Sequence, residues 1–234
     1  MRAVALTDVG ITRDNNEDFY IISENLSLFI VSDGMGGYHA GEIASELAAN
    51  SVLEAFNMKQ AFNFEIDVHD LLVHANEKII EYVKAHPECR GMGTTIVVAY
   101  LDENHLWIAN VGDSRCYGIS QNGIVQLSED HSLVAELVKI GSISPEEAER
   151  HPDRNVITSA LGVERNFEVF IAKFDIKDYS HILLCSDGLS NMVSSQELMD
   201  VIKSEPFDRI PKTLIDLANQ KGGKDNITAV CVEL

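Results

Sequence analysis

Residues 28–48 read LFIVSDGMGGYHAGEIASELA, and this stretch shows a pattern that recurs along the chain. A short apolar run ends in Asp33-Gly34, a glycine-rich segment follows, and apolar side chains then recur at helical spacing. Apolar runs of this length are typical of buried strands, because helices usually extend over about ten or more residues. The stretch therefore predicts a strand, a loop and a helix, with an acidic side chain at the end of the strand.

Other acidic residues also stand where apolar strands begin or end. Asp113 lies in IANVGDSR, Asp187 in ILLCSDGL and Asp225 in GGKDNITAV, and the pair Glu17-Asp18 precedes FYIIS. Asp-Gly and Asp-Asn are common turn dipeptides, so each aspartate alone has a simple interpretation as a turn residue. Carboxylates brought together resist ionisation, and a hard cation such as Mg²⁺ or Mn²⁺ relieves their repulsion. Both interpretations remain open, and a shared metal site is the functional hypothesis.

Strands come in groups and helices come in pairs along the sequence. The regular alternation of strand and helix that marks a parallel sheet is missing from this pattern. We therefore predict an α+β fold in a single domain over residues 1–234, with antiparallel sheets and helices packed outside them. The polar segment at approximately 131–155 is expected to form a flap. Apolar runs at residues 94–101 and near 167–173 are among the predicted strands, and helical spacing is found at residues 39–56, 68–83, 195–203 and 210–220.

The charge of the chain excludes several classes of partner. The 234 residues include 37 acidic and 18 basic side chains, a net charge of −19. Such a balance argues against non-specific binding of nucleic acid and against docking on an anionic membrane. No apolar run approaches the roughly 18 residues of a membrane span, and the four cysteines show no CxxC spacing. We expect a cytoplasmic protein without disulfides.

Eight short motifs, in order, carry a family resemblance. The chain resembles the bacterial type of the metal-dependent Ser/Thr protein phosphatases, the PPM or type 2C class. Each motif alone is weak, but together they extend over nearly the whole sequence. They are RDNNED (13–18), DGMGG with AGEIAS (33–37, 40–45), GMGTT (91–95), VGDSR (111–115), EDHS (129–132), RNVITSALG (154–162), CSDGL (185–189) and KDNITAV (224–230).

The resemblance implies a four-layer sandwich of two antiparallel β-sheets flanked by helix pairs, with a flap near the active site. It also implies two Mn²⁺ or Mg²⁺ ions per chain, and a third, weaker ion. Asp33 is expected to bridge the two ions. The first ion is implied to be completed by Asp187 and Asp225, the second by Glu17 and the carbonyl of Gly34, and the third by Asp113 together with Asp187.

The implied reaction is hydrolysis of phosphoserine or phosphothreonine on proteins, by in-line attack of a hydroxide that bridges the metals. By the same resemblance, Asp18 orients metal-bound water, Arg13 holds the phosphate, and Asn226 supports the cluster. The implied partners are phosphorylated proteins, among them a eukaryotic-like Ser/Thr kinase and its targets. We expect a monomer, with neither a nucleic acid nor a membrane as partner.

Two positions depart from the pattern of the family. Some relatives have a histidine directly after the Asp-Gly, in a position to protonate the leaving group, whereas this chain has Met35. Water on a metal, or the nearby His39, is then the candidate proton donor. Ser159 stands in RNVITSALG where relatives usually carry arginine. That change is expected to alter selectivity rather than the metal chemistry.

Two other functions are open from the residues. A catalytically weak regulatory module that binds phosphoproteins would have lost metal ligands, yet every ligand position here keeps its acidic residue. A serine esterase is suggested by Gly112-Asp113-Ser114, a GDS motif, with Asp178 and His181 at D-x-x-H spacing. Against the esterase, the GDS lies in mid-chain and His181 opens an apolar strand.

Overall fold

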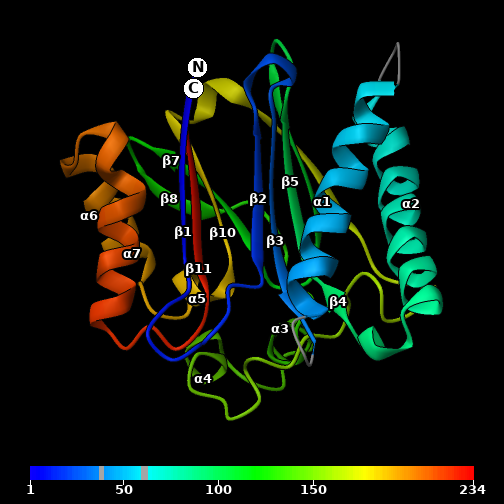
Figure 1. Ribbon diagram of the computed structural model, residues 1–234. Helices are drawn as coiled ribbons and strands as arrows, with labels where there is room; N and C mark the ends of the chain where they lie inside the picture. The colour runs from blue at the N-terminus through cyan, green and yellow to red at the C-terminus, as the bar shows by residue number, and fades with distance from the viewer. Residues whose placement is uncertain (37–39, 59–62) are drawn as a thin grey trace.

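The computed structural model describes residues 1–36, 40–58 and 63–234. Two antiparallel sheets face each other, and a pair of long helices covers the outer side of each sheet (Figure 1). The predicted fold, a four-layer α+β sandwich, is confirmed. No helix in the described ranges is long and apolar enough to cross a membrane.

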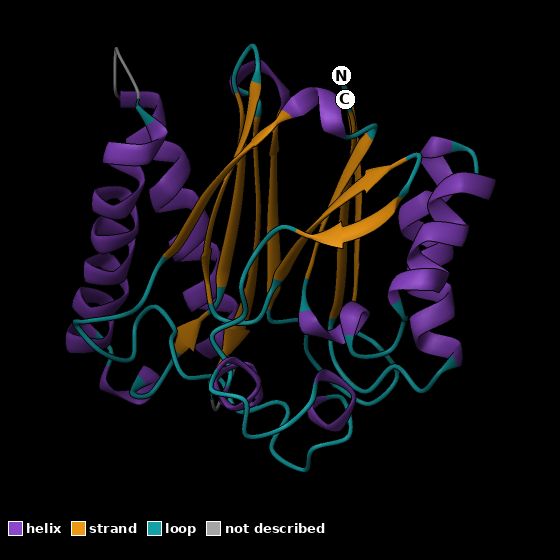
Figure 2. Cartoon of the chain, turned by 180° about the vertical axis from the view of Figure 1, so that it is seen from behind, coloured by secondary structure: helices purple, strands orange, loops and turns teal. Residues whose placement is uncertain are grey.

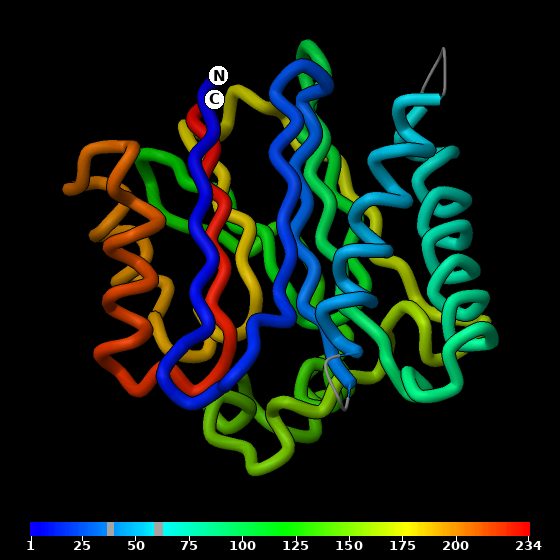
Figure 3. The backbone as a smooth tube through the Cα atoms, in the orientation of Figure 1, coloured from blue at the N-terminus to red at the C-terminus, as the bar shows by residue number. Residues whose placement is uncertain are grey.

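The first sheet joins the two ends of the chain. β11 lies between β1 and β10, and its pairing with β1 runs from Arg2 opposite Glu233 to Asp8 opposite Ile227. Figure 3 shows the first and last strands running side by side. In spatial order the sheet contains β1 (Arg2–Asp8), β11 (Ile227–Glu233), β10 (His181–Cys185), β7 (Arg115–Ser120) and β8 (Gly123–Gln126).

The second sheet contains the strand that opened the sequence analysis. In spatial order it has β2 (Asp18–Ser23), β3 (Leu28–Met35), β5 (Ile96–Leu101), β6 (His105–Val111) and β9 (Phe170–Asp175), and the short β4 (Gly93–Thr94) pairs with the end of β3. The predicted single strand 94–101 is wrong at its start. Thr95 interrupts it, because its N–H and hydroxyl bond to the backbone of Asp33.

The start of β9 also differs from the sequence prediction, which began the strand at Phe167. The structure begins it at Phe170. Glu168, two residues before the strand, donates its N–H to the hydroxyl of Ser159 at 2.9 Å. Residues before β9 therefore belong to the loop that leads from the flap.

Alternating side chains of β3 serve two different apolar layers. Phe29 and Val31 pack between the two sheets, together with Ile108, whereas Leu28 and Ile30 face the helices. Successive side chains of a strand point to opposite faces, so a strand buried on both faces is apolar throughout. This explains why the run 28–31 contains no polar residue.

Two helix pairs form the outer layers (Figures 1 and 2). α1 (Ala40–Met58) and α2 (Phe64–Ala85) pack on the second sheet, and α6 (Ser195–Ser204) and α7 (Ile210–Gln220) on the first. Ser194 and Glu197 form a capping box that begins α6. Short 3-10 turns lie at Glu24–Leu26, Pro87–Cys89, Ile176–Asp178 and Phe207–Arg209.

Three short helices lie at one end of the sandwich, below the sheets in Figure 1. There, two short helices, α3 (Leu133–Lys139) and α4 (Pro145–Ala148), lie in the predicted flap beyond the ends of the sheets (Figures 1 and 2). Neither helix has a buried residue. A third short helix, α5 (Asp187–Ser190), follows β10 at the same end.

Replacement of Ile108 tests the layer between the sheets. Its side chain is fully buried, so Ile108→Ala should lower the free energy of unfolding by about 2–5 kcal/mol through lost contacts and a residual cavity. Val125→Ala is the control, because Val125 is 50% exposed and its loss should cost less than about 0.5 kcal/mol. Urea unfolding followed by circular dichroism measures both, and equal midpoints would contradict the packing described.

Candidate metal centre

Strand pairing forces two of the predicted site residues together. Asp18 at the start of β2 lies directly opposite Asp33 on β3, and opposed residues in an antiparallel ladder have Cα atoms about 4.5–5.5 Å apart. Burial raises the pKa of Asp33 well above its usual value, and the charge of Asp18 raises it further. Burial likewise raises the pKa of Asp18 to about 7, with contributions from Asp187 and Asp225.

Three more aspartates reach the same end of the sandwich from other strands. Asp113 follows β6, Asp187 begins α5 after β10, and Asp225 precedes β11. Burial, and then the charge of Asp187, raises the pKa of Asp113 to about 8. Burial, and then Asp225, raises the pKa of Asp187 to about 6. The structure thus brings all five predicted aspartates into one electrostatically interacting group.

The GMGTT motif fixes the backbone of Asp33. The hydroxyl of Thr94 donates to the Asp33 carbonyl at 2.9 Å, and the Asp33 N–H donates to the hydroxyl of Thr95 at 3.1 Å. The Thr95 hydroxyl is also 2.7 Å from that of Ser114, next to Asp113. Two buried threonines therefore connect the ends of β3 and β6, which carry two of the acids.

Asp18 is held by hydroxyl groups that the sequence analysis did not single out. Its Oδ2 accepts hydrogen bonds from Ser186 and Thr228, both at 2.7 Å, whereas its buried Oδ1 has no hydrogen-bond partner. Both hydroxyls lie inside quoted motifs, CSDGL and KDNITAV. A Ser or Thr within three residues of a candidate acidic ligand was the available signal.

Glu17 lies against the start of α1. Its carbonyl accepts the Gly34 N–H at 3.0 Å, and a Cβ on Gly41 would come within 2.6–2.8 Å of its carboxyl group. A Cβ on Gly34 would in turn lie 2.1 Å from the Gly41 carbonyl oxygen. The two glycines let β3, α1 and the loop before β2 approach closely. Burial raises the pKa of Glu17, and the backbone N–H of Gly41 opposes that rise.

Asn226 ties together the loop that carries Arg13. Its amide donates to the carbonyls of Val9 and Asn15 at 2.9 and 2.8 Å, and its Oδ1 accepts the Glu17 N–H at 2.8 Å. Figure 3 shows this loop beside the one that precedes β11. The guanidinium of Arg13 lies 2.8 Å from Asp225 and is half exposed at the mouth of the site.

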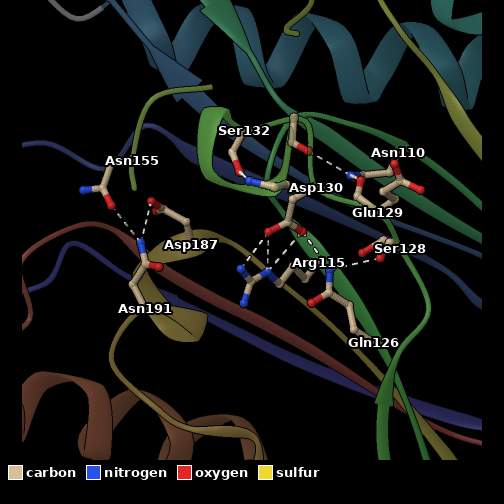
Figure 4. A network of polar contacts seen from close by, with 12 residues as sticks. Asn110, Arg115, Gln126, Ser128, Glu129, Asp130, Ser132, Asn155, Asp187 and Asn191 are labelled. Atoms are coloured by element: carbon tan, nitrogen blue, oxygen red, sulfur yellow. Dashed lines mark hydrogen bonds and ion pairs between the residues drawn. The ribbon is translucent and has the colours of Figure 1, made fainter. Parts of the chain in front are cut away.

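A partly buried ion pair lies at the start of the predicted flap. Arg115 on β7 donates to both carboxylate oxygens of Asp130, with Nη2 at 2.6 Å and Nε at 2.9 Å from Oδ2 (Figure 4). Gln126 donates to Asp130 as well, at 2.7 Å. The N–H of Gly112 donates to Nδ1 of His131 at 3.1 Å. The EDHS motif is thereby held against the strands that flank Asp113.

A chain of amides connects Asp187 with the flap. Asn191 donates to Oδ2 of Asp187 at 3.0 Å and to the side-chain oxygen of Asn155 at 3.4 Å (Figure 4). Asn155 lies at the end of the flap. The sequence analysis gave no role to either asparagine, because their contact joins segments 36 residues apart.

The group suits a hard cation by its chemistry. Its possible metal ligands are carboxylate and carbonyl oxygens, which hard cations prefer. In addition, Oδ1 of Asp18 is a buried hydrogen-bond acceptor without a partner. In the described ranges, no three acidic, His or Cys side chains form a ready-made ligand set. Mg²⁺ and Mn²⁺ keep several waters as ligands, so the protein need not complete the coordination sphere.

The comparisons with known proteins agree with this geometry. Residues 12–230 match the family model described as "Protein phosphatase 2C". The chain belongs to this family. It is 41% identical to "Serine/threonine phosphatase stp" of Listeria welshimeri, over all of this chain and 96% of that protein. The predicted membership of the phosphatase family is confirmed.

Solved structures of related phosphatases share the fold. Stp1 from Staphylococcus aureus has a TM-score of 0.93 and 35% identity, over 99% of this chain and 94% of that one. The catalytic domain of the phosphatase PstP, crystallised with two manganese ions, has a TM-score of 0.88 and 31% identity, over 99% of this chain and 97% of that one.

The alternative function, a serine esterase with Ser114 as its nucleophile, is wrong. The side chain of Ser114 is fully buried and its hydroxyl is engaged with Thr95, so no exposed nucleophile exists at the GDS motif. On the first sheet, Cys185 lies opposite Arg115 and His181 opposite Ile119. His181 is therefore at the other end of the strand from Ser114 and cannot act as its base.

From the sequence, His39 is a candidate proton donor and Met35 is a residue that cannot be one. His39 lies outside the described residues. Met35 ends β3, two residues after Asp33, and its side chain has no ionisable proton. The structure thus offers no general acid at the position after Asp-Gly.

We expect the metal-free protein to lose stability as the pH rises. The carboxyls of Asp18, Asp113 and Asp187 have pKa values of about 7, 8 and 6, above the usual 3.8. The folded chain therefore retains protons that the unfolded chain releases. The resulting stability is full below about pH 4 and is lost as the pH rises to about 8. In EDTA, Tm should fall between about pH 5 and pH 8.

The matching control is the same scan with Mn²⁺ or Mg²⁺. Cations replace the protons, so Tm should rise most at high pH and its dependence on pH should flatten. Asp113→Asn should also flatten the EDTA profile, because it removes one titrating group. Identical profiles with and without the cation would contradict a metal centre at these carboxylates.

Proposed function

We propose that this chain hydrolyses phosphoserine and phosphothreonine in proteins by direct in-line attack of water on phosphorus, with divalent cations as cofactors. The observation that carries the proposal is the gathering of five buried or half-buried aspartates at one end of a 2C-type sandwich. Burial, and then neighbouring negative charge, raises the pKa values of Asp33 and Asp113, so ionised carboxylates at these positions cost stability unless cations offset them. Manganese in the related PstP structure supports this choice of cofactor.

The residues that would hold two ions lie on several elements. We assign Asp33 to both ions, Asp187 and Asp225 to the first, and Glu17 with the Gly34 carbonyl to the second. Asp113 and Asp187 would hold a third, weaker ion. When bound, the ions would supply a hydroxide nucleophile at neutral pH and offset charge on the phosphoryl group.

The side chains around the ions orient the reactants. Oδ1 of Asp18 lacks a partner while Ser186 and Thr228 fix Oδ2, so the carboxylate is held with one oxygen ready to accept a hydrogen bond from water. The guanidinium of Arg13 has a fork of donors that matches phosphate oxygens. Asn226 holds the Arg13 loop in register with Glu17.

The leaving alkoxide needs a proton from another source than residue 35. Met35 cannot donate one. The carboxyls of Asp18 and Asp113 have pKa values of about 7 and 8, but these values hold for the metal-free chain, so neither carboxyl is assigned as the proton donor. We assign the donation to water, with His39 as the alternative donor. His39→Ala with unchanged kcat would leave water as the donor.

The wider setting follows from the same proposal. Phosphorylated proteins are the substrates, and a eukaryotic-like Ser/Thr kinase and its targets are the partners we propose. All four cysteines are free and buried, which favours a reducing compartment, and we place the enzyme in the cytoplasm as a monomer.

Asp33→Asn should abolish turnover by weakening both ions. Mutation of a residue that only hydrogen-bonds to a metal ligand typically lowers metal affinity or activity about 10–100-fold. Replacement of the ligand itself should therefore lower kcat/KM by more than about 100-fold. The measurement is hydrolysis of a phosphothreonine peptide with Mn²⁺, paired with calorimetric titration of Mn²⁺. Asp70→Asn on the exposed face of α2 is the control. Near-normal Mn²⁺ affinity in Asp33→Asn would refute the assignment.

Arg13→Ala should mainly raise KM, because it removes a contact with the substrate phosphate. A charge-assisted hydrogen bond is worth about 1.5–3 kcal/mol, so kcat/KM should fall roughly 10- to 100-fold. Arg13→Lys keeps the charge without the planar fork and should recover only part of the loss. Unchanged kcat/KM in Arg13→Ala would contradict this role, and absence of turnover by the unaltered chain would favour a regulatory phosphoprotein-binding module.

A further inference from the structure

A cavity of about 430 Å³ lies beside the metal centre, between the flap and the second sheet. We call it the flap-side pocket. Met35 from β3, Glu136 from α3 and several residues of the segment 157–168 line it. Its apolar lining includes Met35, Val163 and Phe167, and its acidic lining consists of Glu136, Glu164 and Glu168.

The flap-side pocket adjoins the strand end that carries Asp33. Met35 lies two residues after Asp33 on the same strand, so the two side chains point to the same face of β3. Gly93 lies against both walls, since a Cβ there would come within 2.8 Å of Met35 Cε and 2.7 Å of Val163 Cγ2. A residue next to the phosphorylated one, in a peptide bound at Asp33, is therefore within reach of this pocket.

The wall formed by the segment 157–168 is firmly attached to the sandwich. Thr94 and Leu161 exchange backbone hydrogen bonds of 3.0 and 2.9 Å. The buried Asn76 of α2 accepts the Gly162 N–H at 2.6 Å and donates to the Glu164 carbonyl at 3.0 Å. Figure 1 shows the chain between α4 and β9 running from beneath the sheets toward α2. The pocket is thus a built feature rather than a gap under a loose loop.

Among the described residues, no lysine, arginine or histidine forms an ion pair with Glu136, Glu164 or Glu168. Lys139 interacts electrostatically with Glu136 and Glu168, but its ammonium is hydrogen-bonded to Glu129 at 2.6 Å. An apolar lining with unpaired carboxylates at its rim therefore favours a ligand with an aliphatic stem and a positive head.

We infer that the flap-side pocket binds a lysine or arginine side chain that flanks the phosphorylated residue of the protein substrate. The inference rests on the proposed function, because it places the phosphate at Asp33 and Arg13. Met35, Val163 and Phe167 contact the methylene stem, and the glutamates receive the charged head. Acidic neighbours of the phosphorylated residue are disfavoured by the same three carboxylates.

The test is a set of phosphothreonine peptides with alanine at the flanking positions and one arginine moved through each position in turn. Exposed ion pairs contribute modestly, so three carboxylates around one cation should raise kcat/KM roughly tenfold for arginine at the favoured position, through KM. The preference should shrink as ionic strength rises. Glutamate at that position should lower kcat/KM below the alanine peptide.

The variant Glu136→Gln, Glu164→Gln, Glu168→Gln should bring the arginine-to-alanine ratio of kcat/KM close to one. The matched control, Glu54→Gln, Glu77→Gln, Glu81→Gln, makes the same change in net charge at exposed positions of α1 and α2 and should keep the ratio. Hydrolysis without an arginine preference, or a preference that survives in the pocket variant, would overturn this inference alone. Absence of hydrolysis of every peptide would overturn the proposed function as well.

Discussion

Repulsion among carboxylates at one end of the sandwich is the constraint on which the rest of this structure depends. The ladder between β2 and β3 places Asp18 opposite Asp33, and three other strand ends bring further aspartates within electrostatic range. Such a group lowers the stability of the folded chain, so other contacts must compensate for it. The fully buried apolar layers on both sides of β3, and the hydroxyls that bond to Asp18, supply those contacts.

The local pattern of the sequence predicts the elements well and their contacts poorly. Apolar runs and helical spacing locate the strands and the four long helices, because burial on one or both faces imposes those periods. The interruption at Thr95 and the late start of β9 arise from hydrogen bonds to Asp33 and Ser159, which are remote in sequence. No periodicity encodes such contacts.

The same division applies to the site. Acidic residues at strand ends are visible in the sequence, and the structure gathers them. Ser186, Thr228 and Asn191 were not recognised, since a lone hydroxyl or amide in a motif is more often a turn or capping group. Only the fold shows that two of these side chains hold one carboxylate and the third connects Asp187 with Asn155.

The position of β11 in the middle of the first sheet has a consequence for damaged chains. Its neighbours are β1 and β10, and Asp225 immediately precedes it. A chain cut before this strand would lose Asp225 and expose the hydrogen-bonding edges of two strands at once. Loss of this one strand would therefore remove a candidate metal ligand and favour aggregation through the two exposed strand edges.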